Sequence, residues 1–255
     1  MKRAIVTYAA GAHEELLDVA LPGYKAFAQR HGYELIVGDN VTDLPPAWNK
    51  VSLLMEVLLH HEEVVLFDCD LIVVNSADNF PSLRDGATHA LVRHFDGGSE
   101  VPNSGVWWVT REIVPLLAKM MDLEVFRDHG WWEQAALMTM MGYTVPPQGS
   151  DYRKTQCRNV VQTRWFRECQ FMRLAWNSHP NYRAERPRIV HCSYSDMSRR
   201  LEVMRALARD PAYDYPRFEP PKPKVENKDE EATGTGHGGQ DATRPGVLGG
   251  APATD

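Results

Sequence analysis

Cysteine is scarce in this chain of 255 residues, which has four: Cys69, Cys157, Cys169 and Cys192. They form no CxxC pair and show no regular spacing, so the sequence favours neither a zinc site nor a disulfide framework. We therefore expect a reducing, cytoplasmic compartment.

Long apolar runs are missing as well. No stretch approaches the roughly 20 apolar residues that a transmembrane helix needs, so any membrane association is expected to be peripheral. The first twelve residues superficially resemble a signal peptide. However, their apolar stretch includes Thr7 and Tyr8 and runs directly into Glu14 and Glu15, which indicates a first β-strand instead.

An excess of positive charge is also absent, since 28 lysines and arginines face 34 aspartates and glutamates and the formal net charge is −6. Such a chain has no overall basic field that could hold a polyanion. Nucleic acid is therefore disfavoured as the main partner. The net charge does not exclude a local patch of basic residues.

Aromatic residues stop before the C-terminal end of the chain. All seven tryptophans lie between Trp48 and Trp176, and no aromatic residue follows Phe218. Residues 216–255 are rich in proline, glycine and charge, which is typical of a chain that cannot bury a core. The sequence therefore predicts one domain over residues 1–215 and a disordered tail over residues 216–255.

Deleting the tail after about Pro216 should leave the melting temperature nearly unchanged, because these residues cannot bury apolar surface. A thermal melt of the full-length and truncated chains checks this expectation. A large loss of stability on truncation would show that the tail packs on the domain.

The first third of the chain alternates strand and helix patterns. We predict strands over residues 3–8, 33–37 and 64–67, a helix over 14–30 interrupted by Pro22 and Gly23, and a second helix that begins near Trp48. This βαβαβ order is typical of an α/β fold with helices covering a sheet. Ligands of such folds bind at the carboxyl ends of the strands.

The rest of the pattern is less regular. We predict strands over residues 87–92, 106–109 and 189–192, helices over 112–121, 131–141 and 197–208, and loops with at most one hairpin over 148–188.

Two carboxylates follow the third predicted strand, in the sequence Asp68-Cys69-Asp70. Hard divalent cations such as Mg²⁺ and Mn²⁺ prefer oxygen ligands and can bridge paired carboxylates to a diphosphate. The alternative is a strand-ending turn, in which aspartate is common.

Several short motifs occur together in an order that resembles the GT-A glycosyltransferases. They occupy residues 24–33, 48–50, 67–70, 103–105, 133–134, 176–177 and 189–192. The chain is most similar to the fungal α-galactosyltransferase and mannosyltransferase family and its plant xylosyltransferase relatives, and more distantly to glycogenin. The resemblance spans roughly residues 3–195 and implies a GT-A, Rossmann-like mixed sheet flanked by helices.

The resemblance implies that Asp68, Asp70 and His191 hold Mn²⁺, or Mg²⁺, and through it the donor diphosphate. Imidazole is an acceptable third ligand for Mn²⁺. The alternative for His191 is a hydrogen-bonded core histidine.

Lys50, Thr7 and Tyr8 match donor-binding positions of the same family. Lys50, which we expect in the first turn of a helix, would contact the diphosphate. Thr7 and Tyr8, at the end of the first strand, would receive the nucleoside base, with Tyr8 available for stacking. A solvated lysine and a core tyrosine are the alternatives.

Asn103, Gly105, Glu133 and Gln134 match positions near the donor sugar. The segment from Asn103 to Gly105 resembles the start of a strand whose polar groups face that sugar, or else a plain turn. Glu133 and Gln134 resemble the acidic residue and glutamine beside the reacting centre, where many relatives have aspartate. A carboxylate in the first turn of a helix also has a purely local explanation.

The function implied is metal-dependent transfer of a hexose or pentose from a nucleotide-diphosphate sugar, with UDP favoured and with retention of configuration. The acceptor could be a glycan, a lipid, a protein or, least favoured, a nucleic acid. Arginines are frequent in the region expected to form its site: Arg153, Arg158, Arg164, Arg167, Arg173, Arg183, Arg186 and Arg188. They form either an anion-binding surface or a solvated face.

Three other functions share some of these features. A phosphatase of the haloacid dehalogenase type also uses an Asp-x-Asp pair, but places it after its first strand. A sugar-nucleotide pyrophosphorylase would need a glycine-rich loop near the N-terminus, which Ala9-Ala10-Gly11 does not supply. A non-catalytic protein that binds sugar nucleotides or glycans would keep the fold without needing a complete metal triad.

Overall fold

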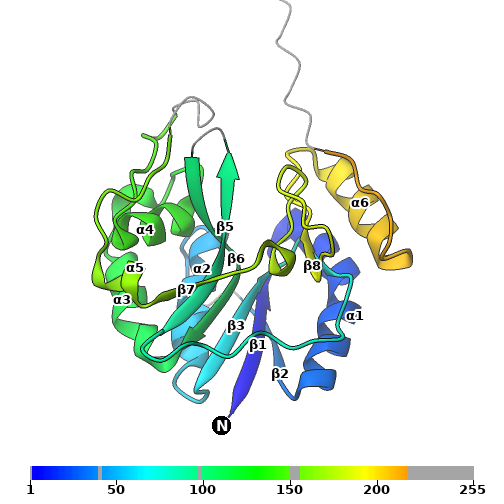
Figure 1. Cartoon of the computed structure of the whole chain (residues 1–255), viewed down its shortest axis with the longest axis horizontal. Helices are drawn as coiled ribbons and strands as arrows, with labels where there is room; N and C mark the ends of the chain where they lie inside the picture. Colours follow the sequence, from blue (N-terminus) through cyan, green and yellow to red (C-terminus); the bar gives the residue numbers. More distant parts are fainter. Residues whose placement is uncertain (1, 40–41, 97–98, 150–155, 218–255) are drawn as a thin grey trace, which may run out of the picture. The chain divides into compact units, whose positions relative to one another are not determined.

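The computed structural model describes residues 2–39, 42–96, 99–149 and 156–217 (Figure 1). The predicted tail, residues 216–255, lies outside the described residues except for Pro216 and Arg217. The strands are β1 (Arg3–Tyr8), β2 (Glu34–Gly38), β3 (Glu63–Asp68), β4 (Leu71–Val73), β5 (His89–Asp96), β6 (Ser99–Thr110), β7 (Cys169–Met172) and β8 (Ile189–His191). The helices are α1 (Glu14–His31), α2 (Pro46–Val57), α3 (Val114–Met121), α4 (Trp132–Met141), α5 (Arg164–Arg167) and α6 (Met197–Arg209).

The main sheet has six strands in the order β2-β1-β3-β6-β5-β7. Strand β1 pairs in parallel with β2 and β3, so the predicted βαβαβ unit is confirmed. Strand β6 is antiparallel to both β3 and β5, and β7 is parallel to β5. The carboxyl ends of β1, β3, β5 and β7 consequently lie at the same edge of the sheet.

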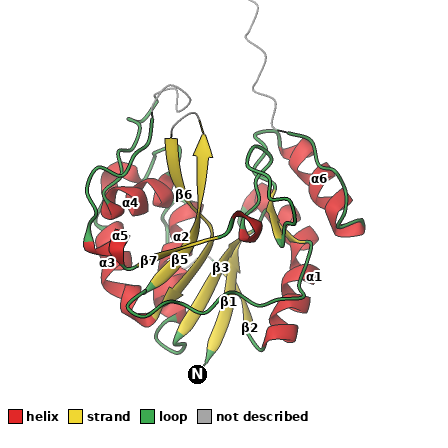
Figure 2. Cartoon of the chain, in the orientation of Figure 1, coloured by secondary structure: helices red, strands yellow, loops and turns green. Residues whose placement is uncertain are grey.

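Both faces of the sheet are buried. Along β3, Val65 and Phe67 belong to a core formed with α1 and α6, whereas Val64 and Leu66 belong to a core formed with α2, α3 and α4. Figures 1 and 2 show these helices on the two sides of the sheet. This arrangement confirms the predicted mixed α/β sheet flanked by helices. Among the described residues, no helix combines the length and apolar character that a membrane crossing requires.

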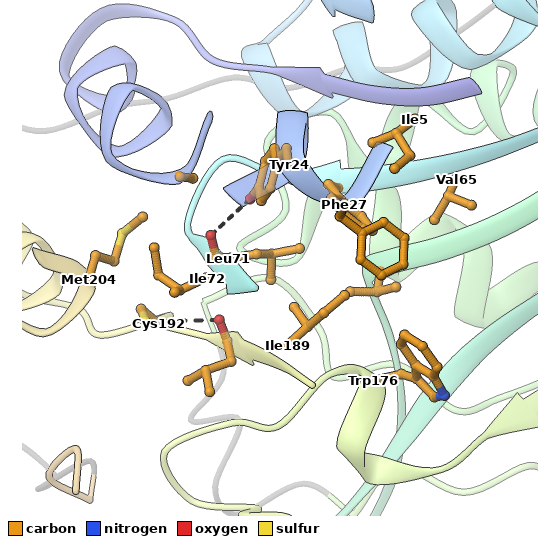
Figure 3. Packing of buried hydrophobic residues seen from close by; sticks show 14 of the residues in the cluster. Ile5, Tyr24, Phe27, Val65, Leu71, Ile72, Trp176, Ile189, Cys192 and Met204 are labelled. Atoms are coloured by element: carbon orange, nitrogen blue, oxygen red, sulfur yellow. Dashed lines mark hydrogen bonds between the residues drawn. The ribbon is translucent and has the colours of Figure 1, made fainter. Parts of the chain in front are cut away.

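A second, two-stranded sheet lies beside the carboxyl edge of the main sheet. Strands β4 and β8 pair in antiparallel register, with Leu71 opposite His191. Figure 3 shows Leu71 beside Tyr24 of α1, and Ile72 beside Met204 of α6. The Tyr24 hydroxyl lies within hydrogen-bonding distance of two backbone oxygens, those of Asp68 (2.6 Å) and Leu71 (3.0 Å). Helix α1 thereby holds the turn that contains both carboxylates of the Asp-x-Asp pair.

The predicted interruption of the first helix at Pro22 and Gly23 is wrong, because α1 continues from Glu14 to His31. Proline removes one backbone hydrogen bond and costs roughly 3 kcal/mol inside a helix. Buried side chains on both sides of it, such as Leu17 and Tyr24, anchor the helix against the sheet and offset this cost.

Two predictions for the second half also need correction. Strand β6 begins at Ser99 rather than Val106, so the segment from Asn103 to Gly105 lies inside a long strand and is neither a strand start nor a turn. The region 148–188 is not only loops, since among its described residues it contains the short helix α5 and the edge strand β7. Both errors have one cause: these strands are completed by pairing with β5, a contact that the local sequence does not reveal.

Candidate active site

Three predicted metal ligands come together at the carboxyl edge of the sheet. Asp68, Asp70 and His191 each offer one ligand atom, and these atoms all lie within 4.8 Å of one another. The Nε2 atom of His191 is 3.2 Å from Oδ1 of Asp70 and 4.0 Å from Oδ2 of Asp68. All three side chains are largely buried.

The fold explains this convergence. Asp68 is the last residue of β3, Asp70 directly precedes β4, and His191 ends β8. The pairing of Leu71 with His191 places the end of β8 beside the Asp-x-Asp turn, although more than a hundred residues separate them in the chain. The backbone N–H of Cys192 also donates to the carbonyl of Asp70 (2.9 Å).

Asn177 orients the ring of His191. The Nδ1–H group of His191 donates to Oδ1 of Asn177 (3.1 Å), which leaves Nε2 directed toward the carboxylates. Burial lowers the pKa of His191, but the nearby Asp70 and Asp68 raise it more, so the net pKa lies above its ordinary value. A histidine with one nitrogen held by a hydrogen bond and the other facing anions has the arrangement of a metal ligand.

Arg200 is a part of the site that the sequence did not reveal. Its Nη1 atom is 3.2 Å from Oδ2 of Asp70, and its guanidinium also donates to the carbonyl of Tyr194 (2.9 Å). Burial raises the pKa of Asp70, but His191 and Arg200 lower it more, so this carboxyl is ionised throughout the neutral range. Arg200 lies in helix α6 among other charged residues, where the sequence pattern is that of an ordinary solvated face.

Lys50 is not a solvated lysine, because its side chain is 12% exposed and forms two ion pairs. Its Nζ atom lies 2.7 Å from Oδ1 of Asp68 and 2.7 Å from Oε1 of Glu133. Burial lowers the pKa of Lys50, but the two carboxylates raise it more, and the amine stays an ammonium. Helix α2 begins at Pro46, so Lys50 lies in its second turn and not in the first.

Glu133 and Gln134 both face strand β6 from the first turn of α4. The hydroxyl of Ser104 donates to Oε1 of Glu133 (3.1 Å), and the backbone N–H of Ser104 donates to Oε1 of Gln134 (3.2 Å). Burial raises the pKa of Glu133, and although Lys50 opposes this effect, the net shift is upward. Of these two residues, which we predicted near the donor sugar, Glu133 is therefore connected to Asp68 through Lys50.

Asn103 and Gly105 lie where β6 bulges away from β5, between the pairs Val92–Asn103 and Leu91–Trp107. A bulge redirects side chains and is common beside active sites. Oδ1 of Asn103 accepts hydrogen bonds from the N–H of Gly105 (2.9 Å) and from Nδ2 of Asn177 (2.7 Å). Asn103 thus supports the same amide that orients the metal-site histidine.

Gly105 leaves the space that the ring of His191 occupies. A Cβ atom at this position would lie 2.6 Å from Cε1 of His191 and 2.9 Å from Oδ1 of Asn103. We therefore expect Gly105→Ala to displace His191 and to weaken the binding of a divalent cation, measured by titration with Mn²⁺, by roughly tenfold or more, as outer-shell changes commonly do. Gly23→Ala is the matched control, because its Cβ would meet only Val73 at 3.6 Å. Equal Mn²⁺ affinities for the two variants would contradict this prediction.

Thr7 and Tyr8 end β1, directly beside the metal site. In the β1–β3 register, Thr7 is opposite Phe67 and Tyr8 is opposite Asp68. Thr7 is fully buried, and within the described residues its hydroxyl has no hydrogen-bond partner. The ring of Tyr8 is buried in the core on the α2 side of the sheet.

The donor set fits a small divalent cation. Mg²⁺ binds oxygen ligands at about 2.1 Å in octahedral geometry, so neighbouring ligands are about 3 Å apart. The separation of 3.2 Å between His191 and Asp70 matches this value, and that of 4.0 Å between His191 and Asp68 exceeds it by about 1 Å. Two carboxylates and one imidazole are suitable ligands for Mn²⁺ or Mg²⁺.

Comparisons with known proteins identify the fold. No protein-family model matches the chain, and no curated protein matches its sequence. The resemblance to the fungal and plant transferase family therefore stays a prediction. Solved structures do match, and the three described next are glycosyltransferases.

Three of these structures can be compared in detail. The first is a glycosyltransferase involved in the glycosylation of the major capsid of PBCV-1, with 12% identity, a TM-score of 0.60, and coverage of 81% of this chain and 100% of that one. The second is GlyE of Streptococcus pneumoniae TIGR4, with 15% identity, a TM-score of 0.55, and coverage of 84% of this chain but only 61% of GlyE. The third is the galactosyltransferase LgtC, solved with donor and acceptor sugar analogs, with 13% identity, a TM-score of 0.51, and coverage of 81% and 95%. The chain thus has the fold of GT-A glycosyltransferases.

Proposed function

We propose that this protein is a metal-dependent glycosyltransferase that moves a hexose or pentose from a nucleotide-diphosphate sugar, with UDP favoured, to an acceptor. The observation that carries the proposal is the cluster of Asp68, Asp70 and His191 at the carboxyl edge of a glycosyltransferase fold. Folding alone does not require three ionisable groups to converge in a buried position at this edge.

The donor diphosphate would lie against Asp68, Asp70 and His191. A divalent cation held by these residues would neutralise the diphosphate and stabilise the negative charge that develops on it as the glycosidic bond breaks. Lys50 adds a fixed positive charge next to Asp68. Such a preorganised charge stabilises a leaving group because no further reorganisation is needed during the reaction.

The nucleoside would lie at the end of β1, beside Thr7 and Tyr8. This strand is the direct neighbour of β3, which ends in Asp68, so base and diphosphate sites are contiguous. The hydroxyl of Thr7 lies buried at this strand end without a hydrogen-bond partner within the described residues, and a ligand group could reach it only after neighbouring side chains move.

The sugar would lie between the metal site and the start of α4, near Asn103, Gly105, Glu133 and Gln134. Glu133 is the carboxylate that we nominate to contact the acceptor or the sugar, because Lys50 joins it to Asp68 and Ser104 fixes its orientation. Retention of configuration follows from the resemblance to retaining transferases and is part of the proposal.

The competing function is that of a non-catalytic protein that binds sugar nucleotides. Its carboxylates would bind metal and nucleotide, but the sugar would not be released. Metal-dependent hydrolysis of a UDP-sugar in the absence of an acceptor separates the two, because a transferase slowly passes the sugar to water.

The proposal includes a cytoplasmic location, because the spacing of the four cysteines is not that of a zinc site or a disulfide framework.

UDP together with Mn²⁺ should raise the melting temperature by about 5–10 °C at a concentration near 100 times the dissociation constant, since ligand binding to the native state adds about 2.7 kcal/mol there. UDP alone and Mn²⁺ alone are the controls and should give much smaller shifts. GDP tests the preference for uridine. If no nucleoside diphosphate shifts the melt with Mn²⁺ present, the proposed function is wrong.

A further inference from the structure

A cavity of about 600 Å³ lies near the carboxyl ends of β5 and β7. Its walls include Arg93 and Phe95 of β5, Phe171 of β7, the loop residues Tyr182 and Arg183, and Arg217 near the end of the described chain. This volume is within the roughly 300–1,000 Å³ that is typical of small-molecule sites.

The cavity opens at the same edge of the sheet as the metal site, because β3, β5 and β7 run in the same direction. A short chain of contacts connects the two. Tyr182 stacks on His94 with ring centroids 4.9 Å apart, and Nε2–H of His94 donates to the carbonyl of Asn177 (2.9 Å). The side chain of Asn177 in turn holds His191. A ligand in the cavity would therefore lie at the same edge of the sheet as the proposed donor site, with three contacts between Tyr182 and His191.

The charged side chains that line the cavity are all positive. Three arginines line it, and none of the described residues that line it is an aspartate or glutamate. Arg93 is paired with Glu100 and Arg183 with Asp214, but these two acids lie outside the lining. Arg217 is exposed, and the buried Nε of Arg183 has no hydrogen-bond partner among the described residues.

Aromatic rings form the other part of the wall. The side chain of Phe95 is 63% exposed, which is unusual for a large apolar residue in a strand. The guanidinium of Arg93 lies 3.8 Å from the ring centroid of Phe171, so that charge and aromatic surface are adjacent. Aromatic faces pack well against the C–H face of a pyranose ring, and guanidinium groups bind phosphate and carboxylate.

We propose that this cavity binds the anionic group of the acceptor, which is a saccharide that carries a phosphate or a carboxylate. The inference rests on the proposed function, and it names the chemical class of the acceptor. Seven of the eight arginines that the sequence singles out in the second half of the chain are among the described residues, and of these seven only Arg183 lines the cavity, whereas Arg93 and Arg217 come from elsewhere.

The test uses ligand-observed NMR titrations of the full chain with glucose 6-phosphate, glucuronate, glucose and inorganic phosphate. We expect both charged sugars to bind at least tenfold more tightly than glucose, and glucose 6-phosphate more tightly than inorganic phosphate. Arg217→Gln and Phe95→Ala should each weaken binding of the charged sugars several-fold. Arg127→Gln, which removes a half-buried arginine paired with Glu124, is the matched control and should have no effect.

The UDP and Mn²⁺ thermal shift, measured on the same samples, separates this inference from the proposed function. Arg217→Gln should keep that shift while losing affinity for the charged sugar. Glucose that binds as tightly as glucose 6-phosphate, or charged-sugar affinity unchanged in both cavity variants, would overturn the inference. Charged sugars that bind without any UDP shift would overturn the transferase and with it the acceptor role of the cavity.

Discussion

Replacing Asp70 by asparagine should lower Mn²⁺-dependent UDP binding and sugar release by roughly 100-fold or more, because changes even in the outer shell of a metal site cost 10- to 100-fold. Asparagine keeps the size of the side chain but removes the charge that a hard cation requires. Asp68→Asn should act in the same direction. The measurements are calorimetric Mn²⁺ and UDP affinities and the rate of sugar release from a UDP-sugar.

The same substitution should also destabilise the metal-free protein. Asp70 is 5% exposed and contacts both His191 and Arg200, so its loss leaves a partly buried arginine, 16% exposed, without its counter-charge. Breaking a buried ion pair in this way costs about 3 kcal/mol. Asp78→Asn is the matched control, because Asp78 is 61% exposed where it pairs with Arg188. An Asp70→Asn protein with unchanged metal-dependent activity would refute the metal site.

This destabilisation reverses what the sequence alone suggests. Two carboxylates two residues apart repel each other. On that basis alone, Asp70→Asn should remove this repulsion from the metal-free protein and should not destabilise it. The structure adds three cations around the pair: Lys50, Arg200 and, when protonated, His191. Electrostatic predictions need all the charges near a group, and most of these come from distant segments of the chain.

The convergence of Asp68, Asp70 and His191 could be predicted because their positions follow from strand patterns. An apolar run that ends in Asp68 identifies a buried strand, and parallel strands collect their carboxyl ends at one edge. The order of short motifs then assigned His191 to the same edge. Local periodicity and motif order were sufficient for these three residues, because each of them lies at the end of a predicted strand or just after it.

The supporting contacts could not be predicted, because they depend on packing between elements. Ser104 meets Glu133 and Asn103 meets Asn177 only because β6 bulges, and that bulge is defined by pairing with β5. Arg200 reaches Asp70 because α6 packs beside β4. Nothing in the local sequence of these segments distinguishes them from ordinary strand and helix surfaces.

Lys50→Met should lower the free energy of unfolding by about 3–4 kcal/mol, because it leaves two buried or partly buried carboxylates without their shared cation. Glu133, at 3% exposure, carries most of this cost. Adding Glu133→Gln to Lys50→Met should therefore restore more than half of the lost stability. Urea denaturation of the wild type, both single variants and the double variant gives the coupling free energy of the pair.

Lys119→Met is the matched control for this cycle, since Lys119 lies on the exposed face of α3. Its substitution should change stability by no more than about 0.5 kcal/mol. A coupling free energy near zero between Lys50 and Glu133 would show that the ion pair does not form in solution. If the pair does form, the double variant recovers stability but not sugar release, because it still lacks both the cation beside the diphosphate and the carboxylate nominated to contact the sugar. That separation of stability from activity distinguishes a working site from a structural ion pair, since a purely structural role for Lys50 and Glu133 predicts that both recover together.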